Sequence, residues 1–342
     1  METLLFLFPG DRPSFGAEEV RALAEVYGLE LEPVVSHQRF LIARSRSWLA
    51  DIVLQRAALV RVVGIGVQIV PRLPFPSTLQ QLDFDALMGD SRTYYLEGVR
   101  VDRKQTADTR LMTVLQELGK QILFQTGKRV SAARPDCRLF VVISKQWVVV
   151  ARKKGEIRAK FFKQRCPKYR KFRHPAAMDP ITNRWMVNVA RVKKGDLLLD
   201  PFCGTGGVLI EAALLGVKPL GVDLDPRMVR GSIENLKMYG LHAEVVRGDA
   251  RYLPVRSADG VATDPPYGRH ASTWGATLRE LLRKLFTQLR GVLRHRGYAV
   301  VAAPQELPVR VLAAEAGLEY VWEGLQYVHG GLTRRFVILR NM

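Results

Sequence analysis

The C-terminal half of the chain alternates between short apolar runs, typical of buried strands, and longer segments whose apolar residues recur at helical spacing. The strand-like runs are 196–200, 218–224, 243–249, 260–266 and 297–304. The helix-like segments are 206–216, 226–240, 274–293 and 307–317. Strands that alternate with helices in this way predict a doubly wound α/β domain with a mostly parallel sheet.

Two further strand-like runs close the chain, at 318–328 and 334–340, and the short segment between them has no helical pattern. Strands joined without a helix pair as an antiparallel hairpin, because a parallel pair needs a long crossover. We therefore expect the hairpin to complete a seven-stranded sheet.

The N-terminal half mixes strands and helices without regular alternation. Residues 1–58 combine two strand-like runs with an amphipathic helix at 17–28. Residues 59–152 contain the strongest amphipathic helix of this half, at 109–127, followed by two apolar strands. The pattern predicts two small α+β domains, at 1–58 and 59–152.

The segment 153–175 differs from both halves, because it is too basic and too aromatic to form a core. Phe161, Phe162, Tyr169 and Phe172 are interleaved with lysines and arginines. Cations bind phosphates and aromatic rings stack on bases, so this composition suits nucleic-acid contact. The alternative is a solvated linker whose aromatic residues dock on a neighbouring domain.

The positive charge is concentrated in the middle of the chain. The net charge is +19 overall, but it is −2 for residues 1–100, +14 for 101–180 and +7 for 181–342. A basic band of this kind favours binding of a polyanion, with strong salt dependence. A merely soluble basic surface remains the alternative. Lipid headgroups are a weaker one, since no amphipathic basic helix accompanies the charge.

Metal, disulfide and membrane chemistry are not indicated. Cys137, Cys166 and Cys203 lie far apart, and the six histidines have no ligand-like spacing, so we expect no metal site and no disulfide framework. No apolar run approaches the roughly 20 residues that span a bilayer. The first residues lack the basic region of a signal peptide. We expect a cytoplasmic protein that does not bind membranes.

The strongest local motif is Asp-Pro-Phe-Cys-Gly-Thr-Gly-Gly at 200–207, which follows a strand and opens a helix. Its glycines permit a tight turn and close approach of the backbone to a ligand. The motif is neither the dinucleotide fingerprint nor a phosphate-binding loop. Asp200 at its entrance favours a cationic ligand, and would lie near the sulfonium and amino end of S-adenosylmethionine.

Two more acidic residues follow the next strands. Asp223 is placed to accept both ribose hydroxyls of a nucleoside cofactor, whereas Asp225 is better explained as the N-cap of the helix at Pro226. Asp249 is placed to accept from the adenine amino group. Ligands of such sheets bind outside the carboxyl ends of the strands, so acidic residues at three successive strand ends predict one cofactor site.

The fourth strand ends in Asp264-Pro265-Pro266-Tyr267-Gly268. Such a loop suits methylation of a planar amine, whose lone pair is delocalised into the ring. Asp264 and a backbone carbonyl, of Pro265 or a neighbour, could accept its two N–H bonds and favour tetrahedral geometry, and Asp264 could take the released proton. Tyr267 could stack on the base.

Together these motifs resemble the Rossmann-fold, class I amino-methyltransferases. The run from His174 to Asn188 resembles the segment that precedes the cofactor loop in that family and helps to enclose the methionine end. The N-terminal half resembles a ferredoxin-like domain at 1–58 followed by a THUMP domain, an RNA-binding module, at 59–152. The linker is then 153–175 and the methyltransferase domain 176–342. The whole order resembles the archaeal tRNA guanine-10 N2-methyltransferase/dimethyltransferase family over nearly the full chain.

The resemblance and the motifs together define three sets of site residues. The expected catalytic residues are Asp264, Pro265, Pro266 and Tyr267. The expected cofactor-binding residues are His174, Pro175, Asp200, Phe202, Cys203, Gly204, Thr205, Gly206, Asp223, Leu224, Gly248, Asp249, Ala250 and Asp264. The expected RNA-binding residues are Arg129, Arg152, Lys153, Lys154, Lys160, Lys163, Arg165, Lys168, Arg170, Lys171 and Arg173.

The resemblance implies transfer of one or two methyl groups from S-adenosylmethionine to N2 of a guanosine in tRNA, with S-adenosylhomocysteine as product. Another tRNA or rRNA position is an alternative, and so is DNA adenine N6-methylation, which uses a similar loop. The basic N-terminal half, without a helix-turn-helix or zinc finger, favours RNA over DNA. A catalytically dead RNA-binding protein would not be expected to keep all these acidic residues. We expect a monomer that binds tRNA, with a complex containing a small activator subunit as the alternative.

Overall fold

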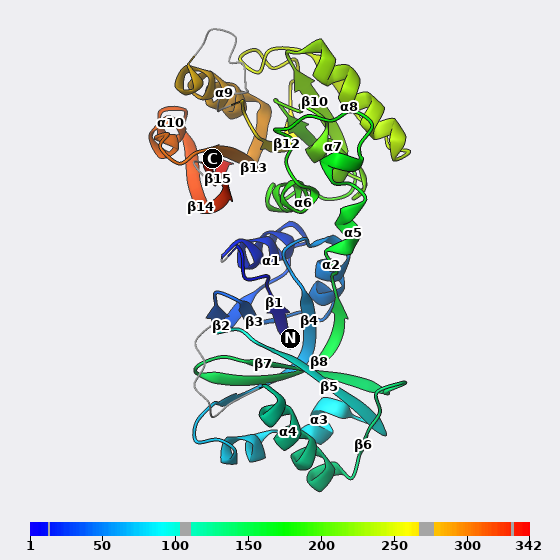
Figure 1. Cartoon of the computed structure of the whole chain (residues 1–342). Helices are drawn as coiled ribbons and strands as arrows, with labels where there is room; N and C mark the ends of the chain where they lie inside the picture. The colour runs from blue at the N-terminus through cyan, green and yellow to red at the C-terminus, as the bar shows by residue number, and fades with distance from the viewer. Residues whose placement is uncertain (13, 103–110, 267–276, 330–331) are drawn as a thin grey trace. The chain divides into compact units, whose positions relative to one another are not determined.

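The computed structural model describes residues 1–12, 14–102, 111–266, 277–329 and 332–342, and the chain divides into two compact units (Figure 1). The first unit contains residues 1–13, 29–55 and 60–157, and the second contains 14–28, 56–59 and 158–342. Each unit has its own sheet and core. None of the helices in the described ranges is long and apolar enough to cross a membrane.

One eight-stranded sheet forms the centre of the first unit, in the order β2-β3-β1-β4-β8-β7-β5-β6. Its strands are β1 (Glu2–Leu7), β2 (Glu32–His37), β3 (Phe40–Ser45), β4 (Val62–Pro71), β5 (Thr93–Arg100), β6 (Arg129–Val130), β7 (Cys137–Ile143) and β8 (Trp147–Glu156). Strand β4 pairs with β1 and β8, so strands from both expected N-terminal domains share one sheet. Because β8 extends to Glu156, the first four residues of the expected linker are strand.

The helices of the first unit cover this sheet. They are α2 (Trp48–Arg56), η1 (Ser77–Gln81), α3 (Phe84–Met88) and α4 (Leu111–Thr126). Helix α4 is the expected amphipathic helix, and Val114, Leu118 and Ile122 on its inner face are fully buried. Their spacing of four residues places them on one side of the helix, where they close the core beneath β5 and β7.

The second unit has the expected seven-stranded sheet, in the order β11-β10-β9-β12-β13-β15-β14. Its strands are β9 (Leu197–Asp200), β10 (Lys218–Asp223), β11 (Glu244–Arg247), β12 (Ala258–Thr263), β13 (Leu293–Pro304), β14 (Leu318–His329) and β15 (Leu332–Asn341). The first five are parallel, and β15 pairs antiparallel with β13 and β14. The doubly wound fold and the terminal hairpin are therefore confirmed.

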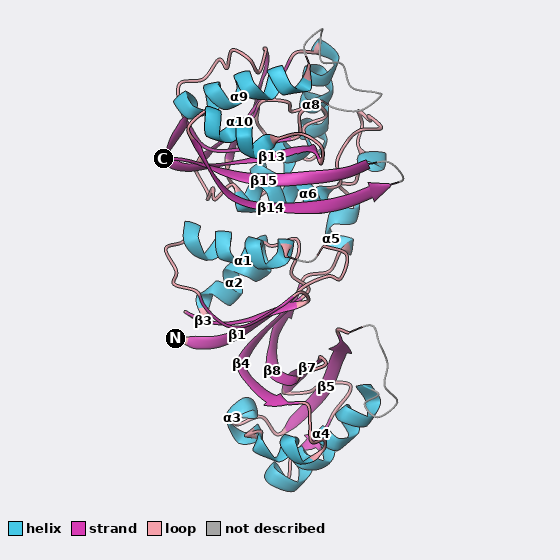
Figure 2. Ribbon diagram, turned by 90° about the vertical axis from the view of Figure 1, so that its left-hand side faces the viewer, coloured by secondary structure: helices cyan, strands magenta, loops and turns pink. Residues whose placement is uncertain are grey.

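Helices cover both faces of this second sheet. The helices of the second unit are α1 (Phe15–Val26), α5 (Lys160–Lys163), η2 (Pro167–Tyr169), α6 (Pro180–Val189), α7 (Gly207–Ala213), α8 (Pro226–Met238), α9 (Leu278–Val292) and α10 (Val309–Glu315). In strand β13, Ala299 and Val301 belong to the core formed with α9 and α10, whereas Val300 belongs to the core on the opposite face, with α6. Figure 2 shows α9 and α10 beside β13. Successive strand residues point to opposite faces, so a strand buried on both sides is continuously apolar.

Helix α1 comes from the N-terminal part of the sequence but belongs to the second unit. Phe15 at its start packs against Trp185 of α6, Trp322 of β14 and Phe336 of β15, with ring centroids 4.7, 5.1 and 5.8 Å apart. The indole nitrogen of Trp185 donates a hydrogen bond to the Phe15 carbonyl at 3.0 Å. These rings pack on one face of the seven-stranded sheet, so that sheet needs the N-terminal segment to complete its core.

Buried polar groups join the same helix to the end of α6. The Glu19 carboxylate accepts hydrogen bonds from Asn188 and from the backbone N–H groups of Ala58 and Leu59. Burial raises the pKa of Glu19, although these hydrogen bonds oppose the shift. Arg191 pairs with Glu18 at 2.9 Å. Each of these groups would lose its partner if α1 left the unit, and a buried polar group without a partner is costly.

We predict that Phe15→Ala destabilises the second unit by about 3–5 kcal/mol, since it leaves a cavity among three aromatic rings. Urea unfolding followed by tryptophan fluorescence measures the loss. Phe124→Ala is the matched control, because Phe124 is 88% exposed and its removal should change stability by less than about 0.5 kcal/mol. Equal stability of the two variants would show that α1 is not part of this core.

Candidate functional site

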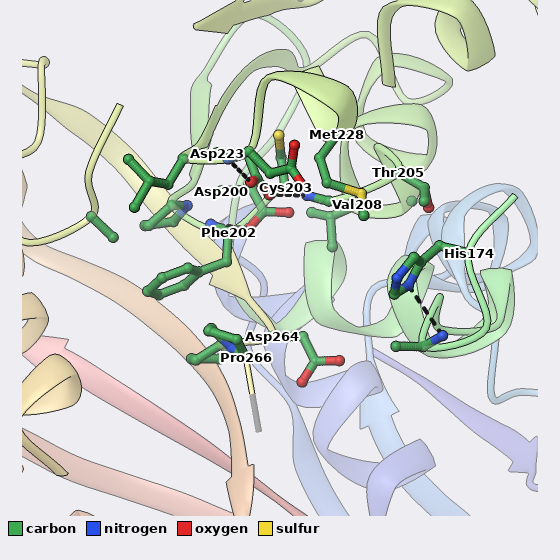
Figure 3. Close-up of a pocket in the computed structure, with 18 of the residues that line it drawn as sticks. His174, Asp200, Phe202, Cys203, Thr205, Val208, Asp223, Met228, Asp264 and Pro266 are labelled. Atoms are coloured by element: carbon green, nitrogen blue, oxygen red, sulfur yellow. Dashed lines mark hydrogen bonds between the residues drawn. The ribbon is translucent and has the colours of Figure 1, made fainter. Parts of the chain in front are cut away.

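Four aspartates lie at the ends of four adjacent parallel strands in the second unit. Asp200 ends β9, Asp223 ends β10, Asp249 follows β11 and Asp264 follows β12. Parallel strands present their carboxyl ends at one sheet edge. All four line one cavity of about 460 Å³, around which Figure 3 shows Asp200, Asp223 and Asp264.

The glycine turn after β9 forms one wall of this cavity. Gly204 and Gly206 have φ of 50° and 79°, a left-handed conformation that favours glycine. A Cβ on Gly207 would lie 2.5 Å from Nδ2 of Asn183, so a side chain would not fit there. This geometry agrees with the expectation from the sequence that the turn needs glycines. Gly206 itself does not line the cavity.

Asp200 is buried beneath this turn. Its Oδ1 accepts hydrogen bonds from the Thr263 hydroxyl at 2.8 Å and from the Phe202 N–H at 3.2 Å. Burial raises the pKa of Asp200 to about 7, and the nearby charges of Asp223 and Asp264 add to this shift. The carboxyl therefore exists in both protonation states near neutral pH and would be ionised most readily beside a cation.

Asp223 is fixed by backbone donors on both oxygens. Oδ1 accepts from the Asp225 N–H and Oδ2 from the Gly204 N–H, both at 2.9 Å. Burial raises the pKa of Asp223. A carboxylate has about four acceptor positions, so each oxygen keeps one for a ligand hydroxyl. Asp225 accepts from the Arg227 N–H at 2.8 Å and caps α8, as the sequence predicts.

Asp249 is held by a neighbour that sequence analysis missed. The Arg251 guanidinium donates to both carboxylate oxygens, at 2.9 and 2.5 Å. This pairing lowers the pKa of Asp249, so the group stays ionised as an acceptor. Gly248 and Ala250 on either side also line the cavity.

Asp264 faces a second unexpected arginine. Arg334 Nη2 lies 3.4 Å from Asp264 Oδ2, and both residues line the cavity with Pro265 and Pro266. No local signal marks Arg334, because it reaches Asp264 only when β15 pairs with β13, opposite Pro304. Tyr267, the fourth expected catalytic residue, lies outside the described residues.

The segment before α6 supplies the remaining wall. His174 lines the cavity, and its Nδ1 accepts the Ala176 N–H at 3.3 Å (Figure 3). Pro175 is exposed and does not line it. The other expected cofactor residues that do line it are Phe202, Cys203, Gly204, Thr205 and Leu224. Sequence analysis missed several further lining residues, namely Arg170, Met178, Asn183, Val208 and Met228.

The expected RNA-binding residues separate into exposed and buried groups. The exposed side chains are Arg129, Arg152, Lys154, Lys160, Lys163, Lys168, Lys171 and Arg173. Arg170 is 1% exposed, Arg165 pairs with the buried Glu211 at 2.6 Å, and Lys153 pairs with Glu97 and Glu156. Internal partners or burial occupy these last three side chains, so we remove them from the RNA-binding set.

The chain resembles known methyltransferases in sequence and in structure. Residues 167–335 match the RMKL-like methyltransferase domain family. The fold resembles that of TrmN from Thermus thermophilus, with a TM-score of 0.54, 19% identity, and coverage of 99% of this chain and 100% of that one.

Longer sequence matches identify relatives along nearly the whole chain. A tRNA (guanine(10)-N2)-dimethyltransferase from Methanothermobacter thermautotrophicus is 31% identical over 314 residues, 91% of this chain and 92% of the relative. A protein of the same name from Methanocaldococcus jannaschii is 33% identical over 266 residues, 74% of this chain and 72% of the relative. The chain therefore belongs to the family of the archaeal tRNA (guanine(10)-N2)-dimethyltransferases.

Proposed function

We propose that this protein is an S-adenosylmethionine-dependent tRNA guanosine N2-methyltransferase that adds one or two methyl groups to the exocyclic amine of guanosine 10. The observation that carries the proposal is the convergence of four acidic strand ends on one cavity, with the Asp264-Pro265-Pro266 loop at the fourth. We infer the substrate, guanosine 10 of tRNA, from the family to which the chain belongs. We also propose that the enzyme acts on tRNA in the cytoplasm.

The cavity fits the cofactor. Its volume of about 460 Å³ lies within the range of small-molecule sites, roughly 300–1,000 Å³. Asp223 would accept the ribose hydroxyls and Asp249 the adenine amine, while Asp200 would face the cationic methionine end. When bound, the cofactor supplies an electrophilic methyl group on its sulfonium.

Asp264 and the prolines after it would act on the target amine. An amino group on guanine shares its lone pair with the ring, so it is a weak nucleophile until its N–H bonds are held out of plane. The Asp264 carboxylate accepts one N–H and then takes the proton that the nitrogen loses on methylation. A carbonyl of the Pro265 region accepts the second N–H. Arg334 beside Asp264 favours the ionised carboxylate that this role requires.

The exposed cations would bind the tRNA. Lys160, Lys163 and Lys168 project from the segment that leads into the cavity wall, and Phe161 beside them is 56% exposed. A neighbouring exposed ring and cations suit a phosphate backbone with unstacked bases. We also propose that residues 59–152, which lie in the first unit from Val60 onward, act as a THUMP domain.

Nucleoside mass spectrometry tests the function. Unmodified tRNA transcripts incubated with enzyme and S-adenosylmethionine should yield N2-methylguanosine or N2,N2-dimethylguanosine, mapped to position 10 by fragment analysis. Transcripts with adenosine at that position should yield none there. Methylation at another guanosine, or of DNA adenine instead of RNA, would contradict the proposed substrate.

We predict that Asp264→Ala and Asp264→Asn lower methyl transfer by about 10²–10⁴-fold, since general-base catalysis contributes that much. Cofactor affinity should stay near that of the wild type. Single-turnover rates with labelled cofactor, together with calorimetric titration, measure the two properties. A normal rate in Asp264→Asn would remove this carboxylate from the mechanism.

We predict that cofactor affinity rises about five- to tenfold from pH 6 to 7.5. The pKa of Asp200 is raised to about 7, so at pH 6 the carboxyl is mostly protonated, and it ionises as pH increases. A cationic ligand prefers the ionised form. Calorimetric titration at several pH values measures this trend, which should vanish in Asp200→Asn.

Asp225→Asn is the matched control for this pH dependence. Arg227 lowers the pKa of Asp225, and asparagine also caps helices, so the trend should persist in this variant. A pH dependence that survives in Asp200→Asn would assign the titrating group elsewhere.

We predict that the triple variant Lys160→Glu, Lys163→Glu, Lys168→Glu binds tRNA more weakly and with a smaller salt dependence. The slope of log affinity against log salt should fall by up to about 0.9 for each lost phosphate contact. Filter binding across a salt series measures it. Lys193→Glu, Lys194→Glu, Lys237→Glu carries the same charge change on other exposed lysines and should have less effect. Equal effects would mean that only net charge matters.

A further inference from the structure

The cavity contains a buried arginine, Arg170, with which no carboxylate of the described residues forms an ion pair. Arg170 is 1% exposed; its Nε donates to the Arg165 carbonyl and its Nη1 to the Thr205 hydroxyl, both at 3.1 Å. Its Nη2 has no hydrogen-bond partner within the described residues. A guanidinium keeps its charge in proteins, so burial without a counter-charge is costly.

The other arginines of the cavity differ from Arg170 in this respect. Arg227, Arg251 and Arg334 lie 2.7, 2.5 and 3.4 Å from an aspartate oxygen. The Glu211 carboxylate acts on Arg170 through space, but it is already paired with Arg165 and Arg184. Among the cavity-lining arginines of the described ranges, Arg170 is thus the one without an ion pair, and desolvation lowers its pKa.

The position of Arg170 indicates which part of a ligand it would meet. Its Nη1 contacts Thr205 and lies 3.3 Å from the place where a Cβ on Gly207 would be. The guanidinium is therefore at the glycine turn that begins with Asp200. Aspartates face the proposed positions of the ribose, the adenine amine and the methionine ammonium. An aspartate repels an anion, so none of these aspartates could bind an anionic group of the ligand.

We propose that Arg170 binds the carboxylate of the methionine portion of S-adenosylmethionine through Nη2. The proposal rests on the cofactor of the proposed function, whose sole anionic group is that carboxylate. An arginine–carboxylate pair supplies charge-assisted hydrogen bonds and would compensate the buried charge. Arg170 would then be a cofactor-binding residue and not one of the RNA-binding cations among which its sequence position placed it.

The experiment compares two ligands that differ only in this carboxylate: S-adenosylmethionine and its decarboxylated form. Calorimetric titrations at pH 7.5 give the affinities of the wild type, Arg170→Met, Arg170→Lys and the control Lys168→Met, which removes an exposed cation nearby. We expect the wild type to bind S-adenosylmethionine about 10- to 100-fold more tightly than the decarboxylated form.

Arg170→Met should lose that preference, with about 10- to 100-fold weaker binding of S-adenosylmethionine and unchanged binding of the decarboxylated ligand. Arg170→Lys should keep part of the preference, and Lys168→Met all of it. Equal weakening of both ligands in Arg170→Met would show a purely structural role and overturn the proposal. If Arg170→Met fails to fold, equal affinity of the wild type for the two ligands would overturn it without any variant.

These titrations test the role of Arg170 independently of the test for tRNA methylation. If the wild type binds neither ligand, both the cofactor and the role of Arg170 are overturned. If it binds S-adenosylmethionine with the expected preference but leaves tRNA unmethylated, the proposed function fails and the role of Arg170 stands.

Discussion

The burial of several carboxylates at one sheet edge, together with their mutual repulsion, is the constraint on which the site depends. Parallel pairing of β9 to β12 places Asp200, Asp223, Asp249 and Asp264 around one cavity. Such groups stay ionised together only where donors or cations offset the repulsion. Backbone N–H groups bind Asp223, and Arg251 and Arg334 face Asp249 and Asp264. Asp200 is fully buried, and burial together with the nearby charges of Asp223 and Asp264 raises its pKa to about 7. A cationic nucleoside ligand would stabilise the ionised form of the Asp200 carboxyl.

Buried cations near the site likewise need a compensating charge. Arg165 and Arg184 share the fully buried Glu211 beside the glycine turn, and within the described part of the chain no carboxylate pairs with the neighbouring Arg170. The cavity therefore has an excess of negative charge at its strand ends and one uncompensated positive charge beside the turn. A ligand with both a cationic centre and a carboxylate matches this distribution better than either a neutral nucleoside or a polyphosphate would.

The core that supports the site also draws on distant sequence. Helix α1 lies more than 150 residues before the catalytic motifs, yet Phe15 packs on Trp185, Trp322 and Phe336 in the second unit. The sheet carrying the motifs is thus covered on one face by α9 and α10, and on the other by α6 together with a helix from the N-terminal segment. A domain boundary drawn from motifs alone misses this dependence, because such motifs mark the ligand-binding edge and not the faces of the sheet.

The sequence by itself determined the doubly wound fold, the terminal hairpin and the acidic strand ends, because strand periodicity and turn chemistry are local properties. Only the tertiary structure decided that Arg334 faces Asp264, that Arg251 holds Asp249 and that Arg170 turns inward from a run of exposed cations. Burial and long-range pairing leave no trace in composition: Lys168 and Arg170 look alike in the sequence, yet one side chain is exposed and the other is inside the cavity wall. Which of two neighbouring charges becomes buried depends on the surface that packs against it, and that surface exists only once the chain has folded.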